Sequence, residues 1–299
     1  MDGGLKIYRI MNNTNEIDNT AKIHPNVVLG NYNKIGKNVV IEILGDNPNA
    51  VAIIGDNNII NDNTRIFIHG KFIVGDWNVF HNDMLIMPED FMLIGHNCWF
   101  GQNTILDGAG GLEIGNGVRV GMYSQIWTHV ASGEQIEGCI LYAKRKTIIC
   151  DDVWLVGSCV VGSGIILGKR STALINSVVT KNTLPDKAYS GNPAKIMEHV
   201  RFYLPKKLDE KFTMLQMWLE EFVTINKALF SLESNGNELI LLNLLENETV
   251  IFTKEESKFT DLSKSVFYLF DKTFNKTNSI SERTIYKFLY KKKKKNIPK

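Results

Sequence analysis

The sequence lacks the features that mark secreted, membrane-spanning or nucleic-acid-binding proteins. Its four cysteines form no CxxC pair and no metal-ligand spacing, which argues against a disulfide framework and favours a reduced, cytoplasmic location. No apolar run approaches the roughly 18 residues that a membrane span needs, and the first residues have no signal-peptide pattern. The net charge of +2 gives no overall attraction to nucleic acid. We therefore expect no nucleic-acid partner.

Aliphatic–glycine pairs recur along the chain at two spacings. A coarse spacing of twenty residues contains a finer spacing of six, as from Ile114 to Val120. Nested periods of this kind are typical of a solenoid, in which each short coil buries its apolar face only by stacking on its neighbours. An ordinary β-sandwich has no reason to repeat at both lengths. The coarse repeat is carried by Ile54-Gly55, Val74-Gly75, Ile94-Gly95 and Ile114-Gly115.

The six-residue register predicts which side chains point inward. Its first position is mostly large and aliphatic and suits a narrow core, whereas its fifth position is small or β-branched and suits a tight corner. Cys98 and Cys159 occupy fifth positions, which predicts buried side chains rather than reactive thiols. The first positions are Ile114, Val120, Ile126, Ile149, Leu155, Val161, Leu167, Ala173 and Val179. The fifth positions are Val118, Ser124, Val153, Cys159, Ile165, Ser171, Ser177 and Thr183.

The register is interrupted once in this stretch. After Ile126 the next unit should begin near residue 132, yet it resumes only at Ile149, so about seventeen residues loop out between roughly His129 and Lys146. A long excursion from a rigid repeat lies on the surface and is usually functional. We therefore expect an active-site loop over about residues 129–146.

Three histidines precede this loop. His69, His81 and His96 are spaced twelve and fifteen residues apart, whereas ligands on stacked coils need a spacing near a whole coil. We therefore expect no metal site.

Segments after the loop carry a family resemblance. They are Ile149–Gly157, Gly162–Gly168, Asn176–Lys181 and the exit sequence Gly191–Lys195. Together they resemble the hexapeptide-repeat acyltransferases, in particular the sugar and xenobiotic O-acetyltransferase branch, over about residues 20 to 200. The resemblance implies an all-β fold, a left-handed parallel β-helix that forms a homotrimer with active sites between subunits. It also implies acetyl-CoA as the co-substrate, lying along the edges of the coils.

The resemblance and the interrupted register together select His129 as the general base. It follows Ile126-Trp127-Thr128 where the loop leaves the repeat, in a context similar to that of the family's catalytic histidine. Acyl transfer to a hydroxyl needs such a base, and histidine is suited to proton transfer near neutral pH. Glu134 and Glu137 follow in the loop. Either could orient the imidazole, and either could equally be an ordinary solvated carboxylate.

The same resemblance assigns residues to the coenzyme. Gly157 stands where relatives often carry a serine, and its backbone N–H would stabilise the acyl oxyanion. Ile175 replaces a small residue of the coenzyme channel, and Glu198 replaces an arginine expected near the phosphates, so the sequence departs from the family pattern at both. The expected coenzyme-binding residues are Trp154, Gly157, Ile175, Thr180, Lys181 and Lys195.

The acceptor side departs further from the relatives. Gly101 occupies the position of an asparagine near the sugar in the galactoside enzymes, and Asp107 is the candidate to bind a sugar hydroxyl instead. The expected activity is acetyl-CoA-dependent O-acetylation of a sugar or of a cell-surface polysaccharide precursor. Two alternatives stay open: N-acetylation of a nucleotide-linked amino sugar, and a non-catalytic trimeric β-helix scaffold.

The composition changes near residue 200, where glycine becomes rare. We expect a lead-in over residues 1–20, the β-helix over 21–200, and a smaller appendage of mixed, mainly helical structure over 201–299.

Periodicity within the appendage predicts individual elements. Helices are expected at Leu208–Phe230, Leu262–Phe270 and Glu282–Leu289, and a hairpin from Leu239–Leu242 and Thr249–Phe252. The tail Lys291–Lys295 is expected to be solvated, with a weak peripheral attraction to an anionic membrane as the alternative.

Overall fold

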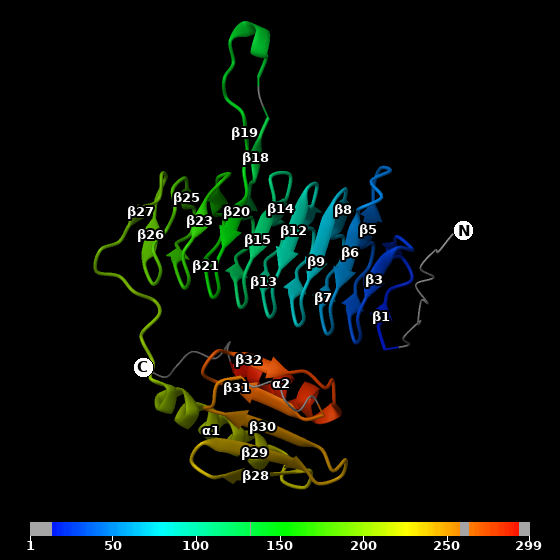
Figure 1. The fold of residues 1–299 in the computed structure, drawn as a ribbon, viewed down its shortest axis with the longest axis vertical. Coiled ribbons are helices and arrows are strands. Elements are labelled where there is room, and N and C mark those ends of the chain that lie inside the picture. The colour runs from blue at the N-terminus through cyan, green and yellow to red at the C-terminus, as the bar shows by residue number, and fades with distance from the viewer. Residues whose placement is uncertain (1–13, 132, 258–262, 293–299) are drawn as a thin grey trace. The chain divides into compact units, whose positions relative to one another are not determined.

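The computed structural model describes residues 14–131, 133–257 and 263–292, and the chain forms two compact units, Met1–Tyr203 and Leu204–Lys299 (Figure 1). Residues 1–13 of the expected lead-in lie outside the described residues. In the part of the chain that the structure describes, no helix combines the length and the apolar character needed to cross a membrane.

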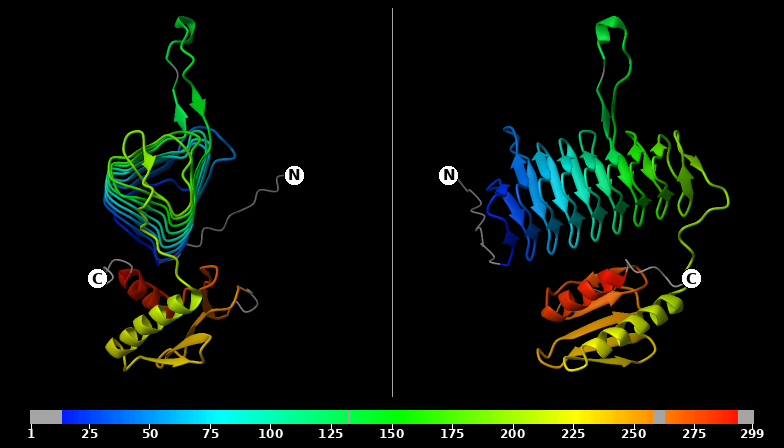
Figure 2. Two further views of the ribbon diagram at one scale, coloured as in Figure 1. Left: turned by 90° about the vertical axis from the view of Figure 1, so that its left-hand side faces the viewer. Right: turned by 180° about the vertical axis from the view of Figure 1, so that it is seen from behind.

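The first unit is a β-helix whose strands enter three parallel sheets in turn, giving the triangular coils seen in Figure 2. The first sheet contains β1 (Glu16–Ile17), β4 (Lys34–Ile35), β7 (Ile59–Ile60), β10 (Val79–Phe80), β13 (Trp99–Phe100), β16 (Arg119–Val120), β21 (Trp154–Leu155), β24 (Thr172–Ala173), β26 (Ala188–Ser190) and the antiparallel β27 (Lys195–Ile196). The second sheet contains β2 (Lys22–Ile23), β5 (Val40–Ile43), β8 (Arg65–Ile68), β11 (Leu85–Met87), β14 (Ile105–Asp107), β17 (Gln125–Ile126), β22 (Val160–Val161) and β25 (Val178–Val179). The third sheet contains β3 (Val27–Leu29), β6 (Val51–Ile54), β9 (Lys71–Val74), β12 (Phe91–Ile94), β15 (Leu112–Ile114), β20 (Thr147–Ile149) and β23 (Ile166–Leu167).

The predicted register is confirmed by burial. Every first-position side chain from Ile114 to Val179 is at most 3% exposed, and every fifth-position side chain from Val118 to Thr183 is at most 7% exposed. Burial also raises the pKa of the Cys98 thiol to about 12, in line with the prediction of an unreactive cysteine. The core of the β-helix is therefore a continuous column of aliphatic side chains, one layer per coil.

Asparagine side chains pair the backbone from coil to coil at the corners of the β-helix. The Asn78 side chain accepts a hydrogen bond from the Cys98 N–H at 2.7 Å and donates one to the Gly95 carbonyl at 3.0 Å. Asn58 does the same one coil earlier, with the Asn78 N–H at 2.9 Å and the Gly75 carbonyl at 3.0 Å. These bonds satisfy buried backbone groups at corners where no strand continues.

The second unit is a five-stranded sheet with two helices. Its strands, in sheet order, are β28 (Phe230–Ser234), β29 (Glu238–Asn243), β30 (Thr249–Thr253), β31 (Ser265–Tyr268) and β32 (Thr273–Asn275); its helices are α1 (Leu208–Ile225) and α2 (Ile280–Lys292). Leu219 and Phe222 of α1 share a core with Leu239, Val250 and Ile285.

The elements expected in this unit are found with two differences. The predicted hairpin is confirmed as β29 and β30, and the last predicted helix lies within α2. The helix predicted over Leu208–Phe230 is found as α1 but ends earlier, at Ile225, and Phe230 is the first residue of β28. The helix expected over Leu262–Phe270 is wrong, because β31 occupies its centre and pairs in parallel with β30. Of the basic tail, Lys291 and Lys292 lie in the last turn of α2. The expectation of a solvated tail is wrong for Lys292, whose side chain is 11% exposed and whose Nζ is paired with a carboxylate oxygen of Glu221. The three lysines that follow lie outside the described residues.

Candidate active site

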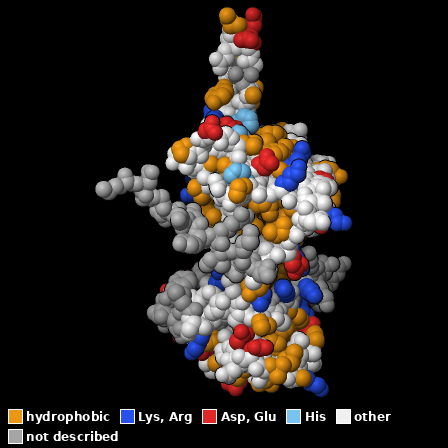
Figure 3. All heavy atoms as spheres, turned by 90° about the vertical axis from the view of Figure 1, so that its right-hand side faces the viewer, with side chains coloured by type: hydrophobic (Ala, Val, Ile, Leu, Met, Phe, Trp, Pro, Cys, Tyr) orange, Lys and Arg blue, Asp and Glu red, His pale blue; other side chains and the backbone are white. Residues whose placement is uncertain are grey.

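The interruption of the repeat forms a hairpin, here called the arm, over residues 129–146. β18 (His129–Val130) pairs antiparallel with β19 (Ala143–Lys144), and one 3₁₀ turn, η1 (Gln135–Glu137), lies near the far end. Because the arm connects β17 to β20, it leaves the β-helix at the edge between the second and third sheets, and it projects outward (Figure 2). Acidic and apolar side chains gather at its free end (Figure 3).

His129 lies at the root of the arm and contacts a buried carboxylate. Its Nδ1 atom is 2.8 Å from Oδ2 of Asp107, and the imidazole is 35% exposed whereas the Asp107 side chain is 2% exposed. An ionised carboxylate only accepts hydrogen bonds, so the contact places the ring hydrogen on Nδ1. Nε2 is then left as an acceptor, which is the state that a general base requires.

Asp107 is itself held by the backbone around His129. Its Oδ2 accepts hydrogen bonds from the N–H and the hydroxyl of Thr128, both at 2.7 Å, and from the His129 N–H at 3.1 Å. Its Oδ1 accepts a longer bond from the Ala109 N–H at 3.3 Å. These donors fix the carboxylate in the wall of the β-helix, and the carboxylate in turn fixes the orientation of the imidazole.

This geometry differs from two expectations. Asp107 is the sequence candidate for binding an acceptor hydroxyl, but its carboxylate is buried and its Oδ2 already makes four contacts, so it does not present itself to a sugar. Glu134 and Glu137 are the candidates for orienting the imidazole, but both are exposed on the arm, and neither hydrogen-bonds to His129 in the described structure. The residue that orients the imidazole is Asp107.

Two further residues at this site are not singled out by the sequence patterns. The rings of Trp127 and His129 meet edge to face with centroids 6.2 Å apart, and the indole N–H donates to the Gln125 side chain at 3.1 Å. The Arg145 N–H donates to the Thr128 carbonyl at 2.8 Å, which brings the returning strand of the arm against the segment that carries His129. The only sequence signal for either is its position at the interruption of the register.

The residues expected to bind the coenzyme lie on two different edges of the β-helix. Gly157 and Ile175 follow β21 and β24, at the edge between the first and second sheets. Thr180 and Lys181 follow β25, at the edge between the second and third sheets, which is also the edge of His129. Ile175, Thr180 and Lys181 are all exposed. The structure therefore groups the expected residues by edge and does not bring them into one cluster within a single chain.

The other two expected coenzyme contacts stand apart. Trp154 faces outward from the first sheet, is 39% exposed, and meets Phe202 edge to face with centroids 6.5 Å apart. Lys195 is exposed in β27, opposite Ser190. Trp154 thus forms part of the outer wall of the first sheet.

At two glycines, the structure shows whether the larger side chain found in related enzymes could be accommodated. A Cβ atom added to Gly157 would have no neighbour nearer than the Met122 carbonyl oxygen at 3.6 Å, so the serine of the relatives would fit there. The Gly157 N–H has no hydrogen-bond acceptor among the described residues and is available to a ligand. At Gly101, by contrast, a Cβ atom would lie 2.4 Å from the Met122 nitrogen, so the asparagine of the galactoside enzymes has no room.

Within residues 14–131, 133–257 and 263–292, no group of three His, Cys, Asp or Glu side chains is placed to hold a metal ion.

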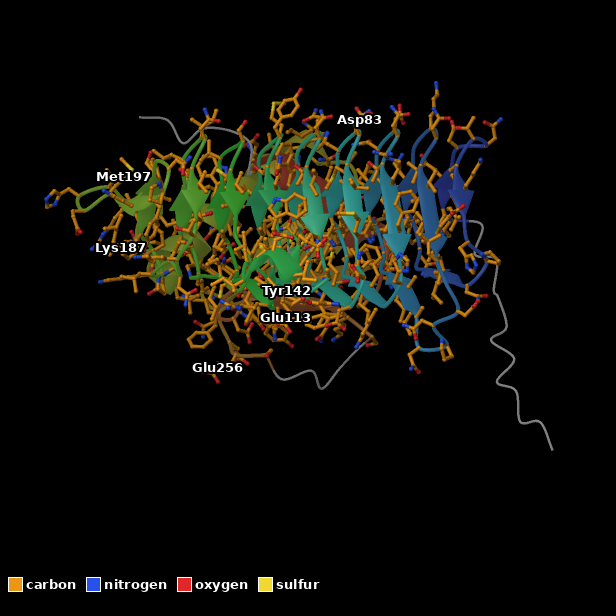
Figure 4. The ribbon with its side chains drawn as sticks, turned by 90° about the horizontal axis from the view of Figure 1, so that it is seen from above. Asp83, Glu113, Tyr142, Lys187, Met197 and Glu256 are labelled. Atoms are coloured by element: carbon orange, nitrogen blue, oxygen red, sulfur yellow. The ribbon has the colours of Figure 1, made fainter. Side chains whose placement is uncertain are left out.

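Figure 4 looks down on the arm, with Tyr142 on the arm and Asp83 and Glu113 on opposite sides of the β-helix.

Comparisons with known proteins find one curated relative that matches part of the chain. No protein-family model matches the chain. A probable macrolide acetyltransferase from Lysinibacillus sphaericus is 32% identical over 102 residues, which make up 32% of this chain and 53% of that relative. The chain thus spans about half the length of the curated relative that it matches.

Several solved structures also resemble the chain. The polysialic-acid-specific acetyltransferase NeuO is 20% identical, with a TM-score of 0.41, over 65% of this chain and 91% of that chain. The polysialic acid O-acetyltransferase OatWY is 16% identical, with a TM-score of 0.35, over 64% of this chain and 91% of that chain. At these sequence identities and TM-scores, neither structure supports a conclusion about the activity or the acceptor of this chain. The hexapeptide register and the three stacked parallel sheets resemble those of the hexapeptide-repeat acyltransferases, and part of the chain is similar to a curated acetyltransferase.

Proposed function

We propose that the protein is an acetyl-CoA-dependent O-acetyltransferase that acts on a hydroxyl of a sugar or of a polysaccharide precursor, with His129 as the general base. The observation that carries this proposal is the contact of 2.8 Å between His129 Nδ1 and the buried Asp107 carboxylate. It leaves Nε2 as an acceptor at a partly exposed position beside the arm.

The chemistry follows from this pair. Nε2 of His129 accepts the proton of the acceptor hydroxyl while the hydroxyl oxygen attacks the carbonyl carbon of the thioester, and the carbon–sulfur bond breaks as the ester forms. The imidazolium then returns its proton to the departing thiolate. The positive charge that His129 carries between these two transfers lies next to the Asp107 carboxylate and is stabilised by it.

The donor for the oxyanion is proposed to come from a second copy of the chain. The Gly157 N–H is available, but it lies on a different edge of the β-helix from His129. Packing of copies edge to edge would bring the His129 edge of one copy to the Gly157 edge of the next. A homotrimer closes such an arrangement with three equivalent sites. Acetyl-CoA would then extend along the coil edges past Thr180 and Lys181.

A sugar acceptor is supported by the surroundings of the base. The indole of Trp127 presents an aromatic surface beside His129, and such surfaces pack well against the apolar faces of sugar rings and other small ligands. The curated relative is a probable macrolide acetyltransferase, and macrolides also offer hydroxyl groups. The hydroxyl is therefore the shared feature of the proposed acceptors.

The test is a thiol-release assay with acetyl-CoA and a panel of sugars bearing free hydroxyls or free amines. His129→Ala should reduce turnover by about 10²–10⁴-fold, the usual contribution of a general base. The matched control is Glu134→Gln, an exposed arm residue without a role at the base, and it should retain normal turnover. Near-normal turnover by the His129→Ala protein would overturn the assignment of the base. Turnover with amines alone would redirect the proposal to N-acetylation.

Binding of acetyl-CoA separates an enzyme from a non-catalytic scaffold. Isothermal titration of the full chain should show saturable binding of the coenzyme. A chain that neither binds the coenzyme nor releases thiol with any acceptor would be a scaffold, and the proposal would fail.

A further inference from the structure

Three consecutive cationic residues, Lys144 to Lys146, lie at the end of the arm. The middle one, Arg145, differs from the two lysines in its ion pairing. Lys144 Nζ lies 3.7 Å from a carboxylate oxygen of Glu89, and Lys146 Nζ lies 2.7 Å from one of Glu113. The guanidinium of Arg145 has no carboxylate partner among the described residues. The two flanking charges are thus compensated by the protein, whereas that of Arg145 is not.

Arg145 is exposed, but its backbone and the first part of its side chain are held in place. Its backbone N–H is bonded to the Thr128 carbonyl at 2.8 Å, and the Ser163 hydroxyl donates to the same carbonyl at 2.8 Å. Its alkyl chain lies across Gly164 in the next coil, where an added Cβ atom would come within 3.0 Å of Arg145 Cδ and 3.1 Å of its Cβ. Gly164 has a φ of +78°, a conformation that favours glycine, and glycine leaves the space that the arginine fills.

This position lies on the edge of the β-helix that carries the proposed chemistry. His129 precedes Arg145 on the opposite strand of the arm, and Thr180 and Lys181 follow on the same edge in the coil beyond Gly164. Arg145 therefore lies between the base and the residues proposed for the coenzyme. A guanidinium with five donors in a fixed plane is the side chain best suited to carboxylate and phosphate groups.

We propose that Arg145 binds an anionic oxygen group of a substrate beside His129. This inference rests on the proposed function, because the anion would belong to one of the two reactants. The shared chemistry is a phosphate or carboxylate: either a phosphate of the coenzyme or the acid group of an acidic sugar acceptor. In both cases Arg145 orients the reactant along the edge and does not itself transfer a proton.

The test compares Arg145→Gln with Lys146→Gln, which removes an equal charge from the next residue, where the lysine already has a partner. Two pairs of ligands are titrated into the full chain: coenzyme A against neutral pantetheine, and glucuronate against neutral glucose. The wild type and Lys146→Gln should bind at least one anionic ligand more tightly than its neutral counterpart. Arg145→Gln should lose roughly 10- to 100-fold in affinity for that anion and nothing for the neutral ligand. Arg145→Lys, which keeps the charge but not the planar donors, should lie in between.

The pair that responds identifies the source of the anion. Loss for coenzyme A alone assigns Arg145 to a phosphate, and loss for glucuronate alone assigns it to an acidic acceptor. The inference is overturned if Arg145→Gln binds both anions as Lys146→Gln does, or if the wild type prefers neither anion to its neutral counterpart. These outcomes are independent of thiol release, so they remain distinct from a failure of the His129 assignment.

Discussion

Oδ2 of Asp107 lies 2.8 Å from Nδ1 of His129, and the same oxygen accepts the N–H of that histidine at 3.1 Å. One buried carboxylate therefore fixes both the backbone and the ring of the proposed base. The two residues are 22 positions apart, and the pairing of β14 with β17 in adjacent coils brings them together. The β-helix thus supplies the orienting group from its rigid wall and places the base at the root of the arm.

Replacing Asp107 by Asn tests this relationship. The amide keeps the size of the side chain but removes the negative charge beside the imidazole, so turnover should fall by about 10²–10⁴-fold with little change in the KM for acetyl-CoA. Because Asp107 acts through His129, the pH profile of kcat should also shift, which a purely structural role would not cause. Steady-state kinetics over pH 5 to 9 check both. Glu137→Gln, on the exposed part of the arm, should leave the profile unchanged.

The repeat made most of the β-helix predictable, because the same inward side chains recur in every coil. Ile126 and Ile149 bracket the interruption in the sequence as β17 and β20 bracket the arm in the structure. Asp107 was harder to assign. Until the coil-to-coil register is known, an aspartate at a strand end could be either an exposed residue that binds substrate or a buried residue that orients a neighbouring side chain. Its role depends on the backbone donors of residues 128 and 129, which no sequence pattern displays.

The second unit was less predictable for a different reason. Leu262–Phe270 contains apolar residues at helical spacing, but its centre, Ser265–Tyr268, also combines β-branched and aromatic residues that suit a strand. A parallel partner, β30, decides between the two structures. The periodicity of Leu262–Phe270 by itself cannot reveal this partner, because it lies in a separate strand that precedes the segment.

Substitution by alanine should destabilise the protein at Gly110 but have little effect at Gly157. A Cβ atom at Gly110 would lie 2.4 Å from the Thr128 carbonyl oxygen and 2.5 Å from the Arg145 nitrogen, so the root of the arm would have to move. Gly110→Ala should lower the free energy of unfolding by at least about 1–3 kcal/mol, as for overpacked sites, and should also reduce turnover. Gly157→Ala has room and should change stability by less than about 0.5 kcal/mol. Urea denaturation and thiol release compare the two variants.

Asn78→Val tests the asparagine bonds at the corners. Valine occupies the corresponding corner at Val118, so its size and burial are tolerated in this fold. At position 78, however, valine would leave the Cys98 N–H and the Gly95 carbonyl without their side-chain partner. Each unsatisfied buried group costs about 1–3 kcal/mol, so we expect a loss of about 2–4 kcal/mol in the free energy of unfolding. A loss below about 0.5 kcal/mol in urea denaturation would mean that these bonds add little to stability.

The ion pair of Arg170 and Asp186 predicts a pH dependence of stability. Both guanidinium–carboxylate contacts are short, at 2.5 and 2.9 Å, and the hydrogen bonds from Arg170 hold the pKa of Asp186 below its ordinary value. A carboxyl whose pKa is lower in the folded than in the unfolded state stabilises the fold above its unfolded pKa. That contribution is lost as the pH falls through the folded pKa.

Asp186→Asn should therefore destabilise the β-helix at pH 7, and the difference from the wild type should shrink as the pH falls through the folded pKa of Asp186. The two side chains are 40% and 41% exposed, so water screens the pair and the difference at pH 7 should be no more than about 1 kcal/mol. Thermal denaturation of the wild type and the variant between pH 2 and pH 7 measures it. The gap between the two melting curves should widen as the pH rises through the acid range and then stay constant. A gap that is constant at every pH would show that the lost contact is steric rather than electrostatic.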